Sequence, residues 1–187
     1  MKIAITGGIG SGKSYVCRLL RKRGIKVYDC DSAAKRLMQT SEVLQEQLKA
    51  LVGDSLYKNG RLVKSVMTTF ILSNPDNMRA VNGIVHPAVA EDFVHSGLNW
   101  MECAILFESG FNRLVDRIIC VTAPLELRIQ RIMSRDNLQR EQALQWISKQ
   151  MPQKEMVERS HFVLLNDDSQ CTEQHLDDIL CQIHKES

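Results

Sequence analysis

Residues 7–14 read GGIGSGKS and directly follow the short apolar run KIAIT. The stretch matches the pattern G-x-x-x-x-G-K-[ST] in full, through Gly7, Gly12, Lys13 and Ser14. Glycines allow backbone N–H groups to approach phosphate oxygens, and the start of the helix that follows favours negative charge. We therefore predict a phosphate-binding loop between a strand and a helix, in preference to a flexible glycine turn.

Two side chains of this loop have the chemistry of a nucleoside triphosphate site. Lys13 is expected to place its ammonium group at the β- and γ-phosphates, and Ser14 to coordinate Mg²⁺ through its hydroxyl group. The sequence contains no N/T-K-x-D stretch of the kind with which GTPases read their base. These features together favour a kinase that uses ATP and Mg²⁺.

Asp29 and Asp31 lie in the stretch YDCD, at the end of the second predicted strand. Alternation along a strand would point both carboxylates to one side, at the sheet edge where ligands bind. Phosphoryl transfer to an alcohol needs a carboxylate that accepts and orients the attacking hydroxyl group, and we assign this role to Asp31. The alternative role for Asp31 is the N-cap of the helix that starts at SAAKRL.

Two further signals lie later in the chain. Glu108 follows the apolar run CAILF at the position of a Walker-B-like carboxylate, although most such strands end in Asp. A helix cap or a salt bridge is its alternative role. Pro87 favours the first position of a helix over VHPAVAEDF, and from the residues alone His86 is the predicted cap of that helix.

Every basic residue between positions 113 and 140 is an arginine, whose planar fork suits bidentate contacts with phosphate. Helical spacing places Arg128, Arg131 and Arg135 on one face, which either contacts phosphate or is a charged outer face. Arg135 and Arg140 flank DNLQ, a predicted turn. This arrangement predicts a mobile flap that closes over the phosphates.

The order of the expected elements is that of an α/β fold. Buried strands are expected at KIAIT, IKVYD, CAILF, RIICV and FVLL. A helix starts at Lys13 and stops at Gly24, and a helical stretch over residues 32–53 breaks near Thr40 and Ser41. Alternation of strands and helices predicts a parallel sheet flanked by helices.

The composition is that of an ordinary globular chain and argues against several classes of protein. Of 187 residues, 44% are hydrophobic and 25% are charged, and a net charge of +2 is too small for binding to nucleic acid mainly through charge. The sequence shows no segment apolar enough to span a membrane and no signal-type stretch. Six cysteines without a C-x-x-C pair fit buried thiols in a reducing cytoplasm.

Taken in order, the phosphate loop, the Asp-x-Asp pair, His-Pro, Leu-Phe-Glu and the arginine-rich segment closely resemble the dephospho-coenzyme A kinase family. The matching stretches are AITGGIGSGKS, GIKVYDCDSAAKRL, VNGIVHP, ILFESG and RIMSRDNLQREQALQWISKQ. This resemblance implies ATP-dependent phosphorylation of the ribose 3′-hydroxyl group of dephospho-coenzyme A, the last step of coenzyme A synthesis. It also implies a P-loop kinase core, a helical insertion that holds the coenzyme A moiety, and an arginine-bearing lid.

The resemblance, laid over the expected elements, gives one domain in three parts. The core covers about residues 1–52, 101–125 and 160–187, the acceptor-binding insertion about 53–100, and the lid about 126–159. The expected partner is the small-molecule acceptor, with no nucleic acid, membrane or obligate protein partner.

Roles for individual residues are also implied by the resemblance. Asp31 would be the catalytic base on the 3′-hydroxyl group, and Lys13 and Arg140 would be the other catalytic residues. Residues on the acceptor side would be His86, Pro87 and Glu108. The residues that would bind ATP are Gly8, Ile9, Gly10, Ser11, Gly12, Lys13, Ser14, Tyr15 and Arg135.

Three departures from the family pattern and two alternative functions stay open, one departure being Ser160 and His161 in place of a small-acidic pair. Tyr15 stands where many members have Thr, and Lys64 in LVKS stands in a segment that is usually Leu-Asp-Arg. Another small-metabolite or nucleotide kinase could use the same core. A non-catalytic nucleotide switch is the alternative from another class, against which Asp31 and the lid arginines argue.

Lys13→Ala is expected to abolish nearly all phosphoryl transfer, because the β- and γ-phosphates lose a fixed positive charge while the apolar core is unchanged. The measurement is the rate of transfer from ATP by the purified variant. Activity within about tenfold of the wild-type rate, or roughly 1.4 kcal/mol of barrier, would contradict the assignment of the loop.

Overall fold

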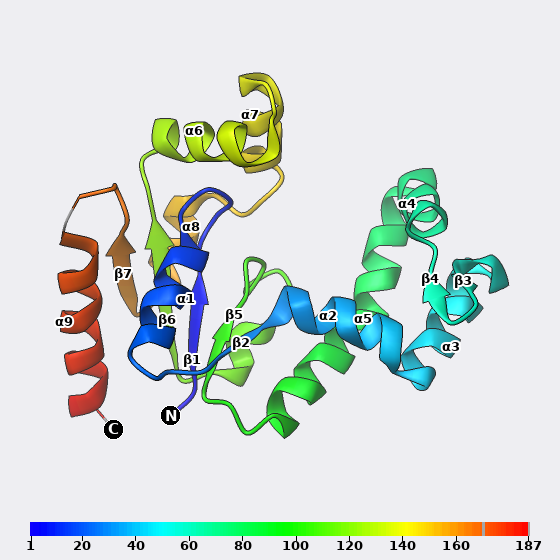
Figure 1. The fold of residues 1–187 in the computed structure, drawn as a ribbon, viewed down its shortest axis with the longest axis horizontal. Coiled ribbons are helices and arrows are strands. Elements are labelled where there is room, and N and C mark those ends of the chain that lie inside the picture. The colour runs from blue at the N-terminus through cyan, green and yellow to red at the C-terminus, as the bar shows by residue number, and fades with distance from the viewer. Residues whose placement is uncertain (170, 187) are drawn as a thin grey trace. The chain divides into compact units, whose positions relative to one another are not determined.

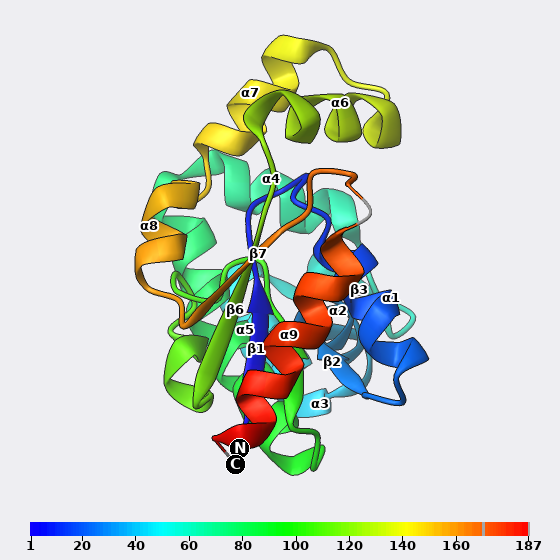
Figure 2. The ribbon, with the colours of Figure 1, turned by 90° about the vertical axis from the view of Figure 1, so that its left-hand side faces the viewer.

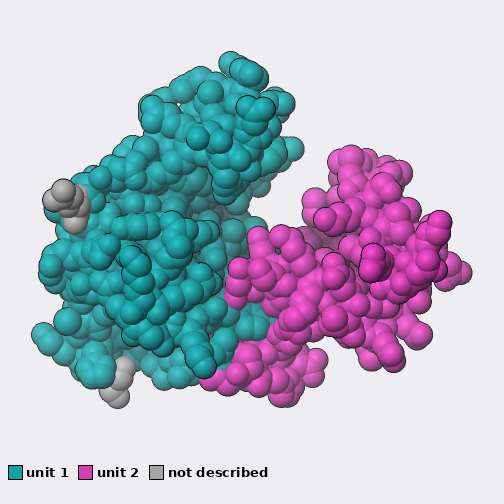
Figure 3. Space-filling view, in the orientation of Figure 1, with its two compact units in different colours: residues 1–28, 98–187 teal, residues 29–97 magenta. Residues whose placement is uncertain are grey.

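The structure, a computed structural model, describes residues 1–169 and 171–186. The chain divides into two compact units, one formed by Met1–Tyr28 and Leu98–Ser187 and the other by Asp29–Gly97 (Figure 3). The helical insertion was expected to begin at about residue 53, whereas the second unit begins at Asp29 and includes the two helices before that position. None of the described helices is long and apolar enough to cross a bilayer.

A five-stranded sheet forms the centre of the first unit (Figure 1). Its strands, in spatial order, are β2 (Val27–Asp29), β5 (Trp100–Glu102), β1 (Ile3–Thr6), β6 (Arg117–Thr122) and β7 (Phe162–Leu165). Strand β1 pairs in parallel with β5 and β6, and β6 pairs in parallel with β7. The parallel α/β architecture predicted from the sequence is confirmed.

Helices on the sheet bury the apolar faces that their spacing predicts. Helix α1 (Lys13–Lys22) and helix α9 (Cys171–Lys185) share one apolar core with the sheet (Figure 2). The side chains that α1 contributes are Val16, Cys17, Leu19 and Leu20, all at most 1% exposed. The loop that joins β1 to α1 is therefore anchored on both sides by buried elements.

Two helices stand beyond the carboxyl ends of β1 and β6, at the top of Figure 1. They are α6 (Leu125–Asp136) and α7 (Arg140–Ser148), and a smaller apolar cluster of Ile129, Ile132 and Ala143 joins them. A short helix, α8 (Gln153–Glu158), follows, and a 3₁₀ turn covers Phe111–Leu114. The turn predicted at DNLQ lies between α6 and α7, where Asn137 is left-handed with φ of 53°.

The second unit is mainly helical, as predicted. Its helices are α2 (Cys30–Thr40), α3 (Glu42–Val52), α4 (Lys64–Ser73) and α5 (Pro75–His95), with a 3₁₀ turn at Asp54–Leu56. The predicted break is confirmed, because Ser41 ends α2 and its hydroxyl group accepts the Leu44 N–H at 3.3 Å to cap α3.

A small hairpin in the second unit was not predicted. Strands β3 (Tyr57–Lys58) and β4 (Arg61–Leu62) pair antiparallel across Asn59 and Gly60, whose φ angles are 51° and 72°. A two-residue Asn-Gly loop with both φ angles positive is the favoured hairpin turn. The sequence signal KNG was therefore present, although the strands are only two residues long.

The predicted helix start at Pro87 was wrong. Helix α5 begins at Pro75, is capped by Asn74, and contains both His86 and Pro87 in its interior. A proline inside a helix costs about 3 kcal/mol, whereas each buried apolar side chain contributes roughly 1.5–3 kcal/mol. The helix continues because one side buries an apolar residue at every fourth position, namely Val81, Val85, Val89 and Phe93.

The prediction of a strand at CAILF was wrong, because β5 ends at Glu102, before this run begins. Cys103 still donates its N–H to the Ile5 carbonyl at 3.0 Å, but its own carbonyl accepts the Thr6 hydroxyl group at 2.8 Å. The chain then turns, and Leu106 and Phe107 are buried by packing rather than by pairing in the sheet. Apolar runs of this length cannot by themselves distinguish a strand from a packed turn.

Candidate functional site

The loop after β1 adopts a conformation that only glycine tolerates at several positions. Gly7, Gly10 and Gly12 have φ angles of 144°, 78° and 92°, and Gly12 is the N-cap of α1. A Cβ atom at Gly10 would collide with the backbone of Arg128, and one at Gly12 with the side-chain amide of Asn166. The backbone is thus packed closely on its outer side and opens onto the start of a helix, the arrangement that binds phosphate.

Lys13 is not an ordinary solvated lysine. Its side chain is on the first turn of α1, the residue is 9% exposed, and its ammonium group donates to the Gly7 carbonyl at 2.8 Å and the Gly8 carbonyl at 3.3 Å. Ser14 is next to it and exposed. A cation over the loop and an exposed hydroxyl oxygen at its end fit the phosphates and the hard metal ion of a nucleotide complex.

Arginines on α6 contact the loop from its carbonyl side. The Nε of Arg128 donates to the Ile9 carbonyl at 2.9 Å, and the residue is only 5% exposed. Burial lowers the pKa of the Arg128 guanidinium, but the ordinary value is so high that the group remains charged. The alternative of a charged outer face is thus wrong for Arg128.

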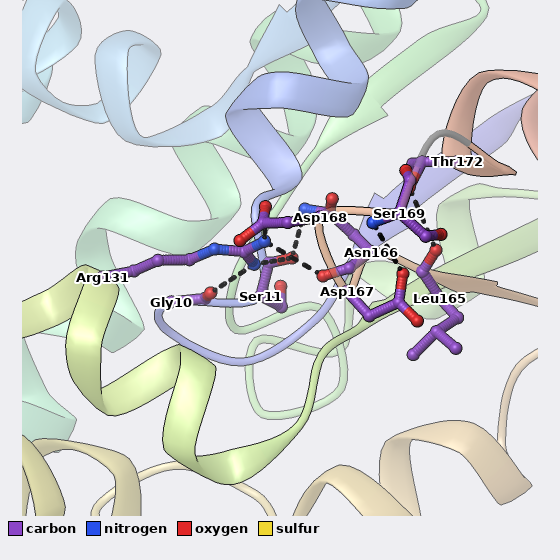
Figure 4. Close-up of polar contacts among 9 residues, drawn as sticks. All are labelled: Gly10, Ser11, Arg131, Leu165, Asn166, Asp167, Asp168, Ser169 and Thr172. Carbon is purple, nitrogen blue, oxygen red and sulfur yellow. Dashed lines mark hydrogen bonds and ion pairs between the residues drawn. The ribbon is translucent and has the colours of Figure 1, made fainter.

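Arg131 joins the loop to the turn after β7 (Figure 4). One terminal nitrogen donates to the Gly10 carbonyl at 3.2 Å and to the Ser11 carbonyl at 3.3 Å. The other donates to the Asn166 carbonyl at 3.1 Å and forms an ion pair with Asp168. Arg131 is therefore also inside a polar network rather than on a solvated face.

Asn166 and Gln150 complete the contacts to the loop. The amide nitrogen of Asn166 donates to the Ser11 carbonyl at 2.9 Å, and Asn166 is 4% exposed. The side-chain oxygen of Gln150 accepts the Ile9 N–H at 2.7 Å. Neither residue was predicted from the sequence. The available signals were that Asn166 directly follows the predicted strand FVLL and that Gln150 ends the stretch RIMSRDNLQREQALQWISKQ, which resembles the kinase family.

A pocket of about 510 Å³ opens beside the loop in the first unit. It is lined by residues of the loop and α1, of α6, and of the segment after β7: Gly12, Ser14, Tyr15, Arg18, Arg131, Ile132, Arg135, Asn166, Asp168, Ser169 and Thr172. Its size is that of a small-molecule site, and its position continues from the phosphate loop. Tyr15, the residue that departs from the family pattern, lines it and has its hydroxyl group 3.4 Å from Glu173.

The two arginines expected in the flap are exposed and paired with carboxylates. Arg135 forms an ion pair with Asp136 at 2.7 Å, and Arg140 makes two bonds of 2.7 Å to the carboxylate of Glu126. Because of this pairing, the pKa of Glu126 is lowered and that of Arg140 is raised. Arg135 lines the pocket, whereas Arg140 is on α7 and is not among the lining residues.

The structure separates the roles of Asp29 and Asp31. Strand β2 ends at Asp29, which caps α2 by accepting the Ser32 N–H and hydroxyl group, both at 2.9 Å. The expectation that strand alternation points both carboxylates to one side is wrong, because Asp31 is already in the first turn of α2. Asp31 is exposed and is not the cap, so the alternative role considered for it belongs to Asp29.

The remaining residues singled out from the sequence are His86, Pro87, Glu108 and the cysteines. His86 and Pro87 are within α5 of the second unit, where burial lowers the pKa of the half-buried His86. Glu108 is exposed in the turn after β5 and accepts the Met151 N–H at 3.3 Å, so it does not end a strand. None of the six cysteines, all of them among the described residues, forms a disulfide, and Cys171 and Cys181 are exposed, unlike the buried thiols expected.

The sequence comparisons with known proteins agree with one another. The family model described as "Dephospho-CoA kinase" matches residues 1–172. A dephospho-CoA kinase of Bacteroides fragilis is 43% identical over 174 residues, which cover 89% of this chain and 85% of that protein. One from Porphyromonas gingivalis is 49% identical over 140 residues, or 72% of this chain and 69% of that protein.

A solved structure agrees with the fold. The crystal structure of TT1252 from Thermus thermophilus superposes with a TM-score of 0.82 and 35% identity, over 100% of this chain and 97% of that one. The structural similarity therefore extends over the whole part of the chain that shows the sequence similarity.

Asp29→Ala is expected to lower the free energy of unfolding by about 1 kcal/mol, because the N-terminal N–H groups of α2 lose their acceptor. Urea denaturation checks this value. The matched variant Asp31→Asn should change the unfolding free energy by only a few tenths of a kcal/mol, since it removes a charge near the helix start but no cap. Equal losses in both variants would contradict the assignment of the cap.

Proposed function

The chain belongs to the dephospho-CoA kinase family, and we propose that it transfers the γ-phosphoryl group of ATP to the 3′-hydroxyl group of dephospho-coenzyme A, giving ADP and coenzyme A. The observation that carries this proposal is the glycine loop between β1 and α1 with the buried Lys13 above it. This loop supplies the donor site, and family membership supplies the acceptor.

The donor would bind through the loop and the adjoining pocket. Backbone N–H groups of the loop and of the start of α1 would contact the phosphates, apart from those of Ile9, Ser11 and Tyr15, which donate to Gln150, Gly8 and Gly12. Lys13 would exchange its carbonyl partners for β- and γ-phosphate oxygens. Ser14 fits Mg²⁺ because its hydroxyl oxygen is exposed at the end of the loop, and the ion would screen the charge of the phosphates. The pocket lined by Tyr15 and Thr172 would take the nucleoside.

The acceptor would be activated by Asp31. As the 3′-oxygen forms its bond to the γ-phosphorus, the bond from that phosphorus to the β,γ-bridging oxygen breaks and ADP leaves. The hydroxyl proton goes to the Asp31 carboxylate. Asp31 is suited to this role because it is exposed, follows β2 by two residues, and is not used to cap α2.

Other residues would hold the acceptor and close the site. His86 and Pro87, within α5, would contact the acceptor, as would Glu108. Arg135 and Arg140 would exchange Asp136 and Glu126 for phosphate oxygens when the segment of α6 and α7 closes. The arginine of each pair is exposed, and both ion pairs are therefore weak enough to be exchanged.

Neither alternative function is favoured over this one. The family model and the curated relatives name one acceptor, and a nucleotide switch would have no use for an exposed carboxylate such as Asp31. The composition is compatible with a cytoplasmic enzyme that works without a protein partner, and we include both in the proposal.

Asp31→Asn is expected to leave the affinity for ATP unchanged and to lower kcat by at least about a hundredfold, because an amide cannot accept the hydroxyl proton. The measurements are calorimetric titration with ATP and steady-state transfer to dephospho-coenzyme A. Asn fills the same volume, so a normal kcat would show that Asp31 is not the base.

Dephospho-coenzyme A is expected to be phosphorylated with a kcat/KM far above that of adenosine, AMP or shikimate. Contacts with the pantetheine tail, remote from the reacting oxygen, would hold the 3′-hydroxyl group in line with the γ-phosphate, so tail binding should raise kcat as well as lower KM. A coupled assay of ADP release measures all four acceptors. A ratio near one for dephospho-coenzyme A over adenosine would overturn the acceptor while leaving ATP use intact.

A further inference from the structure

The carbonyl side of the phosphate loop is held by side chains from outside the loop. Three consecutive carbonyls, of Ile9, Gly10 and Ser11, accept hydrogen bonds from Arg128 or Arg131. The Ser11 carbonyl also accepts one from Asn166. The loop is therefore tied to α6 and to the turn after β7, two segments more than 100 positions away along the chain.

Holding a carbonyl also fixes the direction of an N–H group. In a trans peptide the C=O and N–H of one peptide group point in opposite directions, and none of the described peptides is cis. A donor on the Ser11 carbonyl therefore orients the Gly12 N–H. The Gly10 carbonyl shares its peptide group with the Ser11 N–H, which donates to the Gly8 carbonyl at 3.1 Å and closes the turn.

We infer that Arg131 is a positioning residue for the donor nucleotide, which orients the N–H groups of the phosphate loop through the Gly10 and Ser11 carbonyls. This inference rests on the proposed function, because it assumes that the loop binds a nucleotide. Arg131 is distinct from the flap residues Arg135 and Arg140, whose guanidinium groups pair with the carboxylates of Asp136 and Glu126 and contact no carbonyl of the loop.

The geometry requires the fork of an arginine. The two terminal nitrogens of Arg131 serve four acceptors (Figure 4): one donates to the Gly10 and Ser11 carbonyls, and the other to the Asn166 carbonyl and the Asp168 carboxylate. An ammonium group is a point charge that cannot reproduce this fork. Asp168, whose backbone is left-handed with φ of 64°, forms an ion pair with Arg131.

The competing role is direct contact with the nucleoside, because Arg131 lines the same pocket. The two roles differ in which part of the nucleotide they affect. Orientation of the loop acts on the phosphates, and its loss should weaken a diphosphate more than a monophosphate. Contact with the base or ribose would weaken both equally.

The test is calorimetric titration of wild-type protein and Arg131→Lys with Mg²⁺-ADP and with AMP. The variant is expected to bind ADP at least about tenfold more weakly and AMP less than about threefold more weakly, the first being the loss expected for charge-assisted hydrogen bonds. Arg23→Lys is the matched control. Arg23 has 25% side-chain exposure against 23% for Arg131, and also pairs with a carboxylate, that of Asp177, but contacts no loop carbonyl.

The control should bind both nucleotides within about twofold of wild type. A second variant, Asp168→Asn, keeps the loop contacts of Arg131 and should shift ADP selectively but by less, about two- to threefold. Thermal unfolding of each variant shows that it is folded, and the selectivity for ADP over AMP is a readout that a purely structural role would not move.

Each outcome decides the inference. Equal weakening of ADP and AMP, or no weakening of either, in a folded Arg131→Lys protein would overturn it and leave the proposed function in place. Should Arg131→Lys fail to fold, Asp168→Asn decides alone, and unchanged selectivity there overturns it. Wild-type protein that prefers AMP would contradict the proposed function and the inference together.

Discussion

A backbone that directs its N–H groups toward a phosphate must leave its carbonyls on the other side, and buried carbonyls need donors. In this protein, side chains from α6 and from the turn after β7 donate to the carbonyls of the phosphate loop. A single residue, Arg131, donates to two of these carbonyls. Left-handed glycines permit the turn, but these donors determine which way its peptide groups face. The site is therefore built on both faces of one short loop.

The rest of the first unit keeps those donors in place. Strand β1 is fully buried between β5 and β6, so the start of the loop is fixed by the core. The apolar stripe of α1 fixes the end of the loop, and Ile129 and Ile132 anchor α6 behind it. In the second unit, Asp29 caps α2, so the exposed Asp31 carboxylate is not used as the cap.

Local features of the site could be predicted from sequence, and distant ones could not. The glycine pattern of residues 7–14 defines a strand, a loop and a helix within one short stretch, and the structure has these elements. Asn166 contacts Ser11 across 155 positions, so no spacing in the sequence reveals it. Arg128 and Arg131 were found as a helical face, but whether that face meets solvent or the loop depends on tertiary packing. The helix start predicted at Pro87 was wrong, because burial of the apolar side chains of α5 outweighs the cost of a proline inside that helix.

If the loop presents ATP as proposed, the γ-phosphoryl group is transferred to the ribose 3′-hydroxyl group of dephospho-coenzyme A. The most direct measurement uses ATP labelled in the γ-phosphoryl group, with dephospho-coenzyme A as acceptor, and locates the label in the products by mass spectrometry and ³¹P NMR. The expected result is one labelled phosphate on the 3′-oxygen for each ADP formed. Label found only in inorganic phosphate, or on another hydroxyl group, would contradict it.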